Sequence, residues 1–223
     1  SVVVTAGGTR EPIDPVRFLG NKSSGRQGLA VAAAAARAGA SVRVIAANID
    51  ESVMAALPSG VEVTRVGSAC EMREAAMAQV IGADALVMTA AVADFRPEAA
   101  QASKMKKDPT KTDAPTLRLV RNPDILSEVG HSDIRPALVV GFAAETGTDE
   151  EILANGADKA ARKGADYIAL NRVGAGVGFG DVPNDIRLLD VGGQIVGRYI
   201  GSKDEVAAGL VAQMAAFLDN LER

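Results

Sequence analysis

The sequence has little of what many enzymes use for covalent or metal chemistry. Its 223 residues include one cysteine, one histidine and no tryptophan. A single cysteine, Cys70, excludes an internal disulfide and a cysteine metal cluster. A Ser-His or Cys-His triad would have to use His131, which follows Gly130 in no recognisable catalytic setting. We therefore expect chemistry that relies on lysine, arginine, asparagine, carboxylates, backbone amides or a bound metal.

The sequence also lacks an excess of positive charge and any long apolar run. Its formal net charge of -4 gives the whole protein no electrostatic reason to bind nucleic acid or anionic membranes. No stretch approaches the roughly eighteen apolar residues that span a bilayer, and the first residues lack the regions of a signal peptide. We expect a cytoplasmic protein with neither nucleic-acid nor membrane partners.

Valine-rich runs alternate with alanine-rich stretches along most of the chain. Strands are expected at 1–8, 41–48, 61–66, 84–95, 137–145 and 166–171, and helices at 23–40, 68–82 and 149–163. This alternation is typical of an α/β fold in which helices cover both faces of a doubly wound, mainly parallel, Rossmann-like sheet. Ser23 or Ser24 is expected to cap the first helix, and Gly39 to end it.

Two segments depart from this alternation. Residues 95–118 are polar and contain Lys104, Lys106 and Lys107, so we expect a surface flap that is mobile until it meets an anion. Residues 185–200 read strand, Gly-Gly turn, strand, which predicts a β-hairpin before a last helix at 202–221. We expect one domain over 1–223, with the hairpin as a possible dimer contact.

The stretch TAGGTREPIDPVRFLGNKSSGRQG combines two signals. Gly7 and Gly8 permit close approach of the backbone to a ligand, and residues 23–25 place hydroxyls and amides at a helix N-terminus, where phosphate is favoured. Pro12 and Pro15 keep the helix from starting earlier. The spacing matches neither G-x-G-x-x-G nor G-K-[ST], so no dinucleotide or Walker fingerprint is met. A purely structural turn is the alternative.

Three further stretches could contribute to a nucleotide site. The small residues of TAAVADFRP would let a planar base lie near the backbone, and Asp94 could bind ribose hydroxyls or simply cap a turn. The KMKK lysines could close over a triphosphate, although such a run is more often a solvated surface. Lys159 and Lys163, four residues apart, share one helical face.

Six stretches of the sequence, in this order, resemble the bacterial phosphopantothenoylcysteine synthetase family. They are VTAGGTREPIDPVRFLGNKSSGRQG, AAVADFR, KMKK, RNPDIL, GFAAET and RKGADYIALN. The likeness covers nearly the whole chain, although the family often has His at Lys22 and Lys-Met at Arg26-Gln27. It implies a CTP-dependent ligase that joins 4'-phosphopantothenate to L-cysteine through an acyl-cytidylate, with release of pyrophosphate and CMP. It also implies a homodimer and an upstream flavin-dependent decarboxylase domain, from which this chain is expected to be cut.

The resemblance assigns roles to particular residues. Asn21 matches the asparagine that handles the acyl-cytidylate, Lys104 matches the flap lysine of the first half-reaction, and Arg17 is assigned with Asn21 to the substrate. The positions that match CTP contacts are Met88, Thr89, Ala90, Asp94, Lys104, Pro123, Asp124, Ile125, Leu126, Phe142, Lys159 and Lys163. To these we add Gly8, Ser23, Ser24, Gly25, Ala93 and Phe95 from the same loops. Magnesium (Mg²⁺) is expected with the triphosphate, with ligands that the spacing does not identify.

Two other functions stay open. A dinucleotide-binding reductase or nucleotide sensor would bind NADPH tightly and not CTP, but the missing G-x-G-x-x-G and the sequence IALN after Tyr167, in place of a Tyr-x-x-x-Lys dyad, count against a reductase. A structural or dimerising partner of an upstream domain would show no nucleotide-induced stabilisation.

Overall fold

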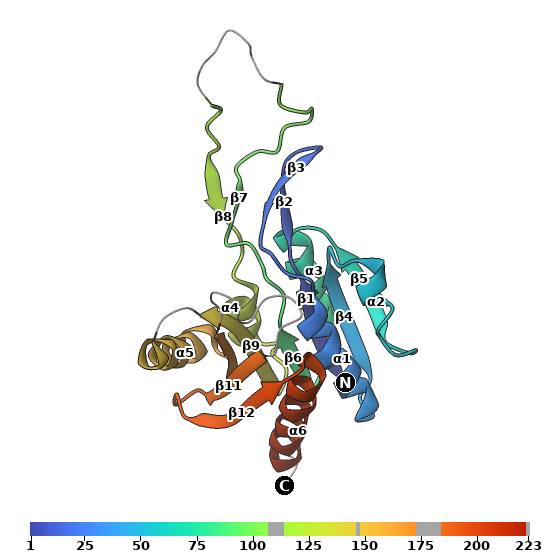
Figure 1. Cartoon of the computed structure of the whole chain (residues 1–223), viewed down its shortest axis with the longest axis vertical. Coiled ribbons are helices and arrows are strands. Elements are labelled where there is room, and N and C mark those ends of the chain that lie inside the picture. The colour runs from blue at the N-terminus through green and yellow to red at the C-terminus, as the bar shows by residue number, and fades with distance from the viewer. Residues whose placement is uncertain (107–113, 146–147, 173–183, 222–223) are drawn as a thin grey trace.

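The structure is a computed structural model that describes residues 1–106, 114–145, 148–172 and 184–221. Its body is an eight-stranded sheet covered by helices, and two short antiparallel strand pairs rise away from one end of that sheet (Figure 1). Across the described residues, no helix combines the length and the apolar content that crossing a bilayer requires.

The main sheet confirms the expected α/β architecture. Its strands are β1 (Val2–Gly7), β4 (Val42–Ala47), β5 (Glu62–Val66), β6 (Ala85–Met88), β9 (Leu138–Glu145), β10 (Tyr167–Arg172), β11 (Asn184–Asp190) and β12 (Ile195–Gly201). They lie in the order β12-β11-β10-β9-β6-β1-β4-β5. Neighbours from β5 to β10 are parallel, whereas β11 and β12 pair antiparallel as the predicted hairpin. The sheet is therefore mixed but mostly parallel.

Helices cover both faces of the sheet, as a doubly wound fold requires. They are α1 (Arg26–Arg37), α2 (Glu51–Met54), α3 (Ala69–Gln79), α4 (Ile125–Gly130), α5 (Asp149–Lys163) and α6 (Lys203–Leu221). Alternate residues of β1 point to opposite faces: Val2 and Val4 pack with α1 and α6, whereas Val3 packs with α3 and α4. Buried residues of α5 pack with β9 and β10 on the second face. Two apolar layers therefore hold the sheet.

The start of α1 corrects one prediction. The helix begins at Arg26, and its N-cap is Gly25 in the left-handed conformation (φ 77°) with no side-chain cap, so neither Ser23 nor Ser24 caps it. Ser23 Oγ instead accepts a hydrogen bond of 3.4 Å from the Gly25 amide. A Cβ at residue 25 would lie 2.4 Å from Ile49 Cδ1, so glycine is required where the chain enters the helix.

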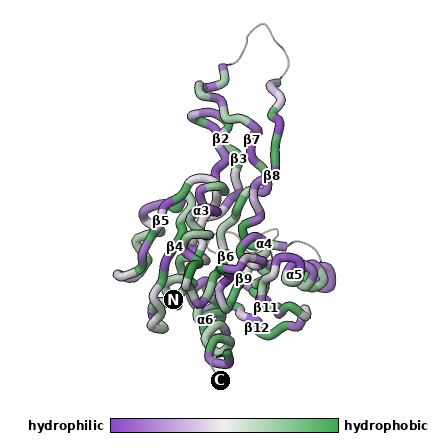
Figure 2. Tube along the Cα trace, turned by 180° about the vertical axis from the view of Figure 1, so that it is seen from behind, coloured by the Kyte–Doolittle hydropathy of each residue, from purple (hydrophilic) through white to green (hydrophobic). Residues whose placement is uncertain are grey.

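The long opening segment is a hairpin and not a loop. β2 (Arg10–Asp14) pairs antiparallel with β3 (Arg17–Gly20), and β7 (Phe95–Pro97) pairs with β8 (Leu119–Arg121). We call the described residues of 10–20, 95–106 and 114–121 the arm. Figure 2 shows that the arm carries both hydrophilic and hydrophobic segments. Residues 107–113, including Lys107 and the middle of the expected flap, lie outside the described residues.

Candidate nucleotide site at the strand switch point

The chain reverses its direction of sheet growth between β1 and β6. From β1 it continues to β4 and β5 on one side, whereas from β6 it continues to β9 and β10 on the other. The segments that leave these two strands pair through Gly8 and Ala91, and the Ala91 amide donates to Gly7 O at 2.8 Å. Open α/β sheets bind ligands beyond the carboxyl ends of the strands at such a switch point.

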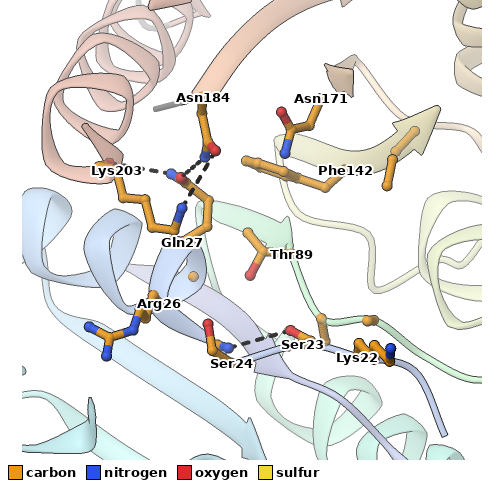
Figure 3. Close-up of a pocket in the computed structure, with 16 residues that line it drawn as sticks. Lys22, Ser23, Ser24, Arg26, Gln27, Thr89, Phe142, Asn171, Asn184 and Lys203 are labelled. Carbon is orange, nitrogen blue, oxygen red and sulfur yellow. Dashed lines mark hydrogen bonds between the residues drawn. The ribbon is translucent and has the colours of Figure 1, made fainter. Parts of the chain in front are cut away.

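Two adjoining cavities open at this point, one on each side of the sheet. The α1 pocket, of about 330 Å³, lies by α1 and α6 (Figure 3). The α5 pocket, of about 460 Å³, lies by α4 and α5. Ala90, which follows β6, and Phe142, within β9, line both cavities. One ligand could therefore extend from one side of the sheet to the other past this shared wall.

The α1 pocket has the character of an anion site. Ser23, Ser24 and Gly25 line it at the N-terminus of α1, where backbone amides favour negative charge. The charged side chains among its described lining residues are all basic: Lys22, Arg26 and Lys203. Thr89, predicted from the sequence, lines this pocket as well. The structure therefore brings residues 23–25 and the predicted Thr89 and Ala90 to one cavity.

The far wall of the α1 pocket was missed by the sequence analysis. Asn184 Nδ2 donates to Gln27 Oε1 at 2.6 Å, and Lys203 Nζ lies 3.5 Å from Asn184 Oδ1 (Figure 3). Asn171 Oδ1 is buried and accepts no hydrogen bond from the described residues, so a ligand donor could satisfy it. Asn171 ends a predicted strand and could have been proposed on that signal. The other three residues, Gln27, Asn184 and Lys203, come from distant parts of the sequence and meet only in the folded chain.

The α5 pocket collects most of the residues assigned to CTP. Its lining includes Met88, Ala90, Ala93, Asp94, Phe95, Pro123, Asp124, Ile125, Leu126, Phe142, Lys159 and Lys163. Arg121, Asn122 and Arg162 line it too, although the sequence analysis did not single them out. The structure thus joins four separate stretches of sequence in one cavity.

Ion pairs hold the two lysines of α5 at this cavity. Lys163 pairs with Asp124, and Lys159 Nζ lies 3.5 Å from Glu145 Oε1. Burial raises the pKa of Asp124, but hydrogen bonds from Lys163 and from the Ser127 amide outweigh it and hold the pKa below its ordinary value. The Asp124 carboxylate is therefore charged at neutral pH and orients Lys163 beside the pocket.

Asn21 lines neither cavity, but it adjoins lining residues of both. Its Nδ2 donates to Val92 O at 3.2 Å, and Val92 lines the α5 pocket. The next residue, Lys22, lines the α1 pocket. An amide at this position could contact a group that bridges the two cavities.

Gly8, Arg17 and Lys104 line neither of the two cavities. The Gly8 amide donates to Ala47 O at 3.0 Å, and its carbonyl accepts from Asn48 Nδ2, so neighbouring chain occupies its polar groups. Arg17 and the exposed Lys104 lie on the arm. The structure therefore does not bring these three residues to either cavity of their own chain.

The described residues offer carboxylates but no dense metal cluster. Among them, no group of three or more His, Cys, Asp or Glu gathers as metal ligands would. Asp94 and Asp124 both line the α5 pocket. One or two carboxylates suit a magnesium ion that keeps its waters and binds phosphate oxygens. The residues present therefore fit magnesium delivered with a nucleotide.

Known proteins match the chain over most of its length. The family model described as the DNA/pantothenate metabolism flavoprotein C-terminal domain matches residues 1–218. The coenzyme A biosynthesis bifunctional protein CoaBC of Mycobacterium bovis is 44% identical over 223 residues, covering 97% of this chain and 52% of that protein. A cysteine/cysteine sulfinic acid decarboxylase from an unknown prokaryotic organism is 37% identical over 214 residues, covering 96% of this chain and 57% of that protein.

Solved structures share the fold. A crystal structure of the C-terminal domain of CoaBC has a TM-score of 0.79 and 30% identity, covering 98% of this chain and 95% of that one. A Cab2 mutant in complex with phosphopantothenate-cysteine has a TM-score of 0.72 but 15% identity, covering 100% and 88%. The chain spans about half the length of the curated relatives it matches, 52% in the bovine mycobacterial protein. The names of these relatives therefore describe proteins that are about twice as long as this chain.

Proposed function

Because the chain belongs to the family of DNA/pantothenate metabolism flavoprotein C-terminal domains, we propose that it is the ligase that joins 4'-phosphopantothenate to L-cysteine at the expense of CTP, in the cytoplasm, for coenzyme A biosynthesis. The observation that carries the proposal is the pair of cavities that share Ala90 and Phe142, one of them basic and at a helix N-terminus, with Asn21 beside lining residues of each. The similarity to CoaBC proteins supports a role in coenzyme A biosynthesis.

The two cavities suit the two ends of CTP. The nucleoside occupies the α5 pocket, where Asp94 accepts from ribose hydroxyls, and the phosphates extend past Ala90 to the amides of residues 24–26. The phosphopantothenate carboxylate attacks the α-phosphorus, and the bond to pyrophosphate breaks. The cysteine amine then attacks the acyl carbon and CMP leaves. These steps ask the protein for positioning and charge, with no protein nucleophile.

Asn21 is the residue that acts between the two steps. Its Nδ2 would turn from Val92 O to the acyl oxygen, where it stabilises the negative charge that develops as the amine attacks. Lys104 offsets charge on the triphosphate in the first step, and Arg17 binds the substrate. Bound magnesium would supply further charge neutralisation on the phosphate nearest the nucleoside, where Asp124 of the α5 pocket is the carboxylate that is not assigned to the ribose.

We further propose a homodimer, because the arm needs a partner. It exposes Val16 (60%) and Phe18 (52%), and it carries Arg17 and Lys104 away from the two cavities of its own chain. A second copy would cover the apolar side chains and receive the two cations. The β11–β12 hairpin, with exposed Ile195 and Ile200, is the alternative contact. An upstream flavin-dependent decarboxylase domain would account for the remaining length of the CoaBC relatives.

Pyrophosphate release tests the function directly. We expect the protein with magnesium, CTP and phosphopantothenate to release one equivalent of pyrophosphate per site before cysteine is added, and further turnover only after cysteine. Pantothenate, which lacks the phosphate, serves as the substrate control. The absence of any release under every metal condition would disprove the ligase.

Two variants test the division of roles. Asn21→Asp should form the acyl-cytidylate and accumulate it, because the anionic side chain opposes the charge that develops in the second step. Lys104→Gln should slow acyl-cytidylate formation by about a hundredfold. Trapped intermediate is measured by mass spectrometry after acid quench. If both variants stall at the same step, the assigned roles are wrong.

A further inference from the structure

One buried carboxylate lies outside both cavities and has no part in the reaction described above. Asp14, at the end of β2, has a side chain with 0% exposure. Charged groups are rarely buried unless they are paired and hydrogen-bonded. The Asp14 carboxylate accepts four hydrogen bonds, and their donors identify the segments that it joins.

The donors come from two parts of the arm. Asp14 Oδ1 accepts from the amides of Val16 at 2.9 Å and Arg17 at 2.8 Å, which closes the turn between β2 and β3. Asp14 Oδ2 accepts from Arg17 Nη1 at 2.6 Å and from the Met105 amide at 3.1 Å. The last bond joins positions 91 residues apart in sequence. One side chain thus joins the hairpin to the lysine-rich segment.

The segment is fixed on both sides of Lys104. Upstream, the Gln101 amide donates to Ile13 O at 2.8 Å. Downstream, Met105 is held twice, through its amide by Asp14 and through its carbonyl by Arg17 Nη1 at 3.3 Å. Burial raises the pKa of Asp14, but hydrogen bonds from Val16, Met105 and Arg17 outweigh it and lower the pKa. The carboxylate is therefore ionised at neutral pH and accepts all four bonds.

We propose that Asp14 is a positioning residue that fixes Arg17 and Lys104, the two cations of the arm, in a set geometry before substrate arrives. This inference rests on the proposed function for the roles of the two cations. Fixing a flexible lysine in advance removes an ordering cost from the step in which it acts, so loss of the anchor slows that step. Asp14 would position the two cations in the same way whether the arm serves its own chain or a second copy.

Asp14→Asn tests the proposal, because it keeps the shape and removes the charge. An amide NH₂ replaces an acceptor oxygen and cannot accept from both Arg17 and Met105. We expect pyrophosphate release in a single turnover without cysteine to slow by about tenfold. Glu11→Gln is the matched control: Glu11 is buried on the same strand, but it accepts from the Ala69 amide at 2.9 Å, away from the Lys104 segment. It should change the rate less than about twofold.

A thermodynamic cycle separates positioning from general stability. In a protein that already carries Arg17→Gln and Lys104→Gln, Asp14→Asn should have no further effect on the rate, because the cations that it positions are gone. An equal slowing in both backgrounds would overturn the proposal, as would an unchanged rate in the single variant. If wild-type protein releases no pyrophosphate, the proposed function fails.

Amide hydrogen exchange tests the anchor without any catalysis. In the full-length protein, Asp14→Asn should speed exchange at residues 101–106 at least tenfold, and Glu11→Gln should leave it unchanged. Unchanged exchange in Asp14→Asn would show that the carboxylate does not hold the segment, whatever the activity of the protein.

Discussion

Different interactions stabilise the body and the arm. In the body, side chains such as Leu138 and Val140 are completely buried between the sheet and its helices. In the arm, large apolar side chains point outward, whereas the carboxylates Glu11 and Asp14 are buried and hydrogen-bonded. The body therefore fixes the cavities by apolar packing. The arm is shaped by a few polar bonds and keeps its apolar surface for another molecule.

The largest effect that would test this comparison is on stability. Leu138→Ala should lower the free energy of unfolding by about 2–5 kcal/mol, because it opens a cavity in the core. Leu119→Ala on the arm, where Leu119 is 44% exposed, should change it by less than about 0.5 kcal/mol. Urea unfolding of the two variants measures both values. Similar losses would mean that the arm packs as tightly as the body.

A smaller effect concerns the outward apolar surface. Phe18→Glu should weaken self-association by about thirtyfold, the cost of losing a side chain at the centre of an interface. Ile195→Glu on the β11–β12 edge is the matched variant, since it is similarly exposed. Sedimentation of both proteins across a concentration series measures the dimer constant. Dissociation by Ile195→Glu alone would move the interface from the arm to the hairpin.

The smallest effect is electrostatic and belongs to the body. The pKa of Asp124 is lowered from its ordinary value of 3.8, so the ionised carboxylate stabilises the folded protein above that pH, and the contribution is lost as the pH falls below it. Asp124→Asn should therefore make stability less dependent on pH below about 4. The change should stay under about 1 kcal/mol, because the side chain is half exposed. The measurement is the free energy of unfolding of both proteins at a series of acidic pH values. A steeper pH dependence in Asp124→Asn than in the wild type would contradict the prediction.

The sequence predicted the body far better than the arm. Apolar runs such as VVVTAG report burial on both faces of a parallel sheet, so β1 and its neighbours were found by pattern alone. Pro12 and Pro15 suggested a loop, whereas β2 and β3 form a hairpin that tolerates proline because the pair has free edges. Pairing between segments as distant as Asp14 and Met105 leaves no local signal.

The candidate site was predicted in the same uneven way. Residues 88–90, Asp94 and residues 123–126 were assigned by resemblance, and the structure gathers most of them around one cavity. Gly7 was taken as a place for ligand approach, but a Cβ there would lie 2.0 Å from Ala47 O, so the glycine is required by the neighbouring strand. Gln27 and Asn184 were missed because their hydrogen bond joins positions 157 residues apart.

The shared wall of the two cavities has a practical consequence for ligand discovery. Ala90 is small and Phe142 is only partly buried, so little side chain separates the α1 pocket from the α5 pocket. Two weak fragments, one for each cavity, could be joined by a short rigid tether across Ala90. Because the second fragment would then bind at a millimolar effective concentration, the joined compound could bind far more tightly than either part.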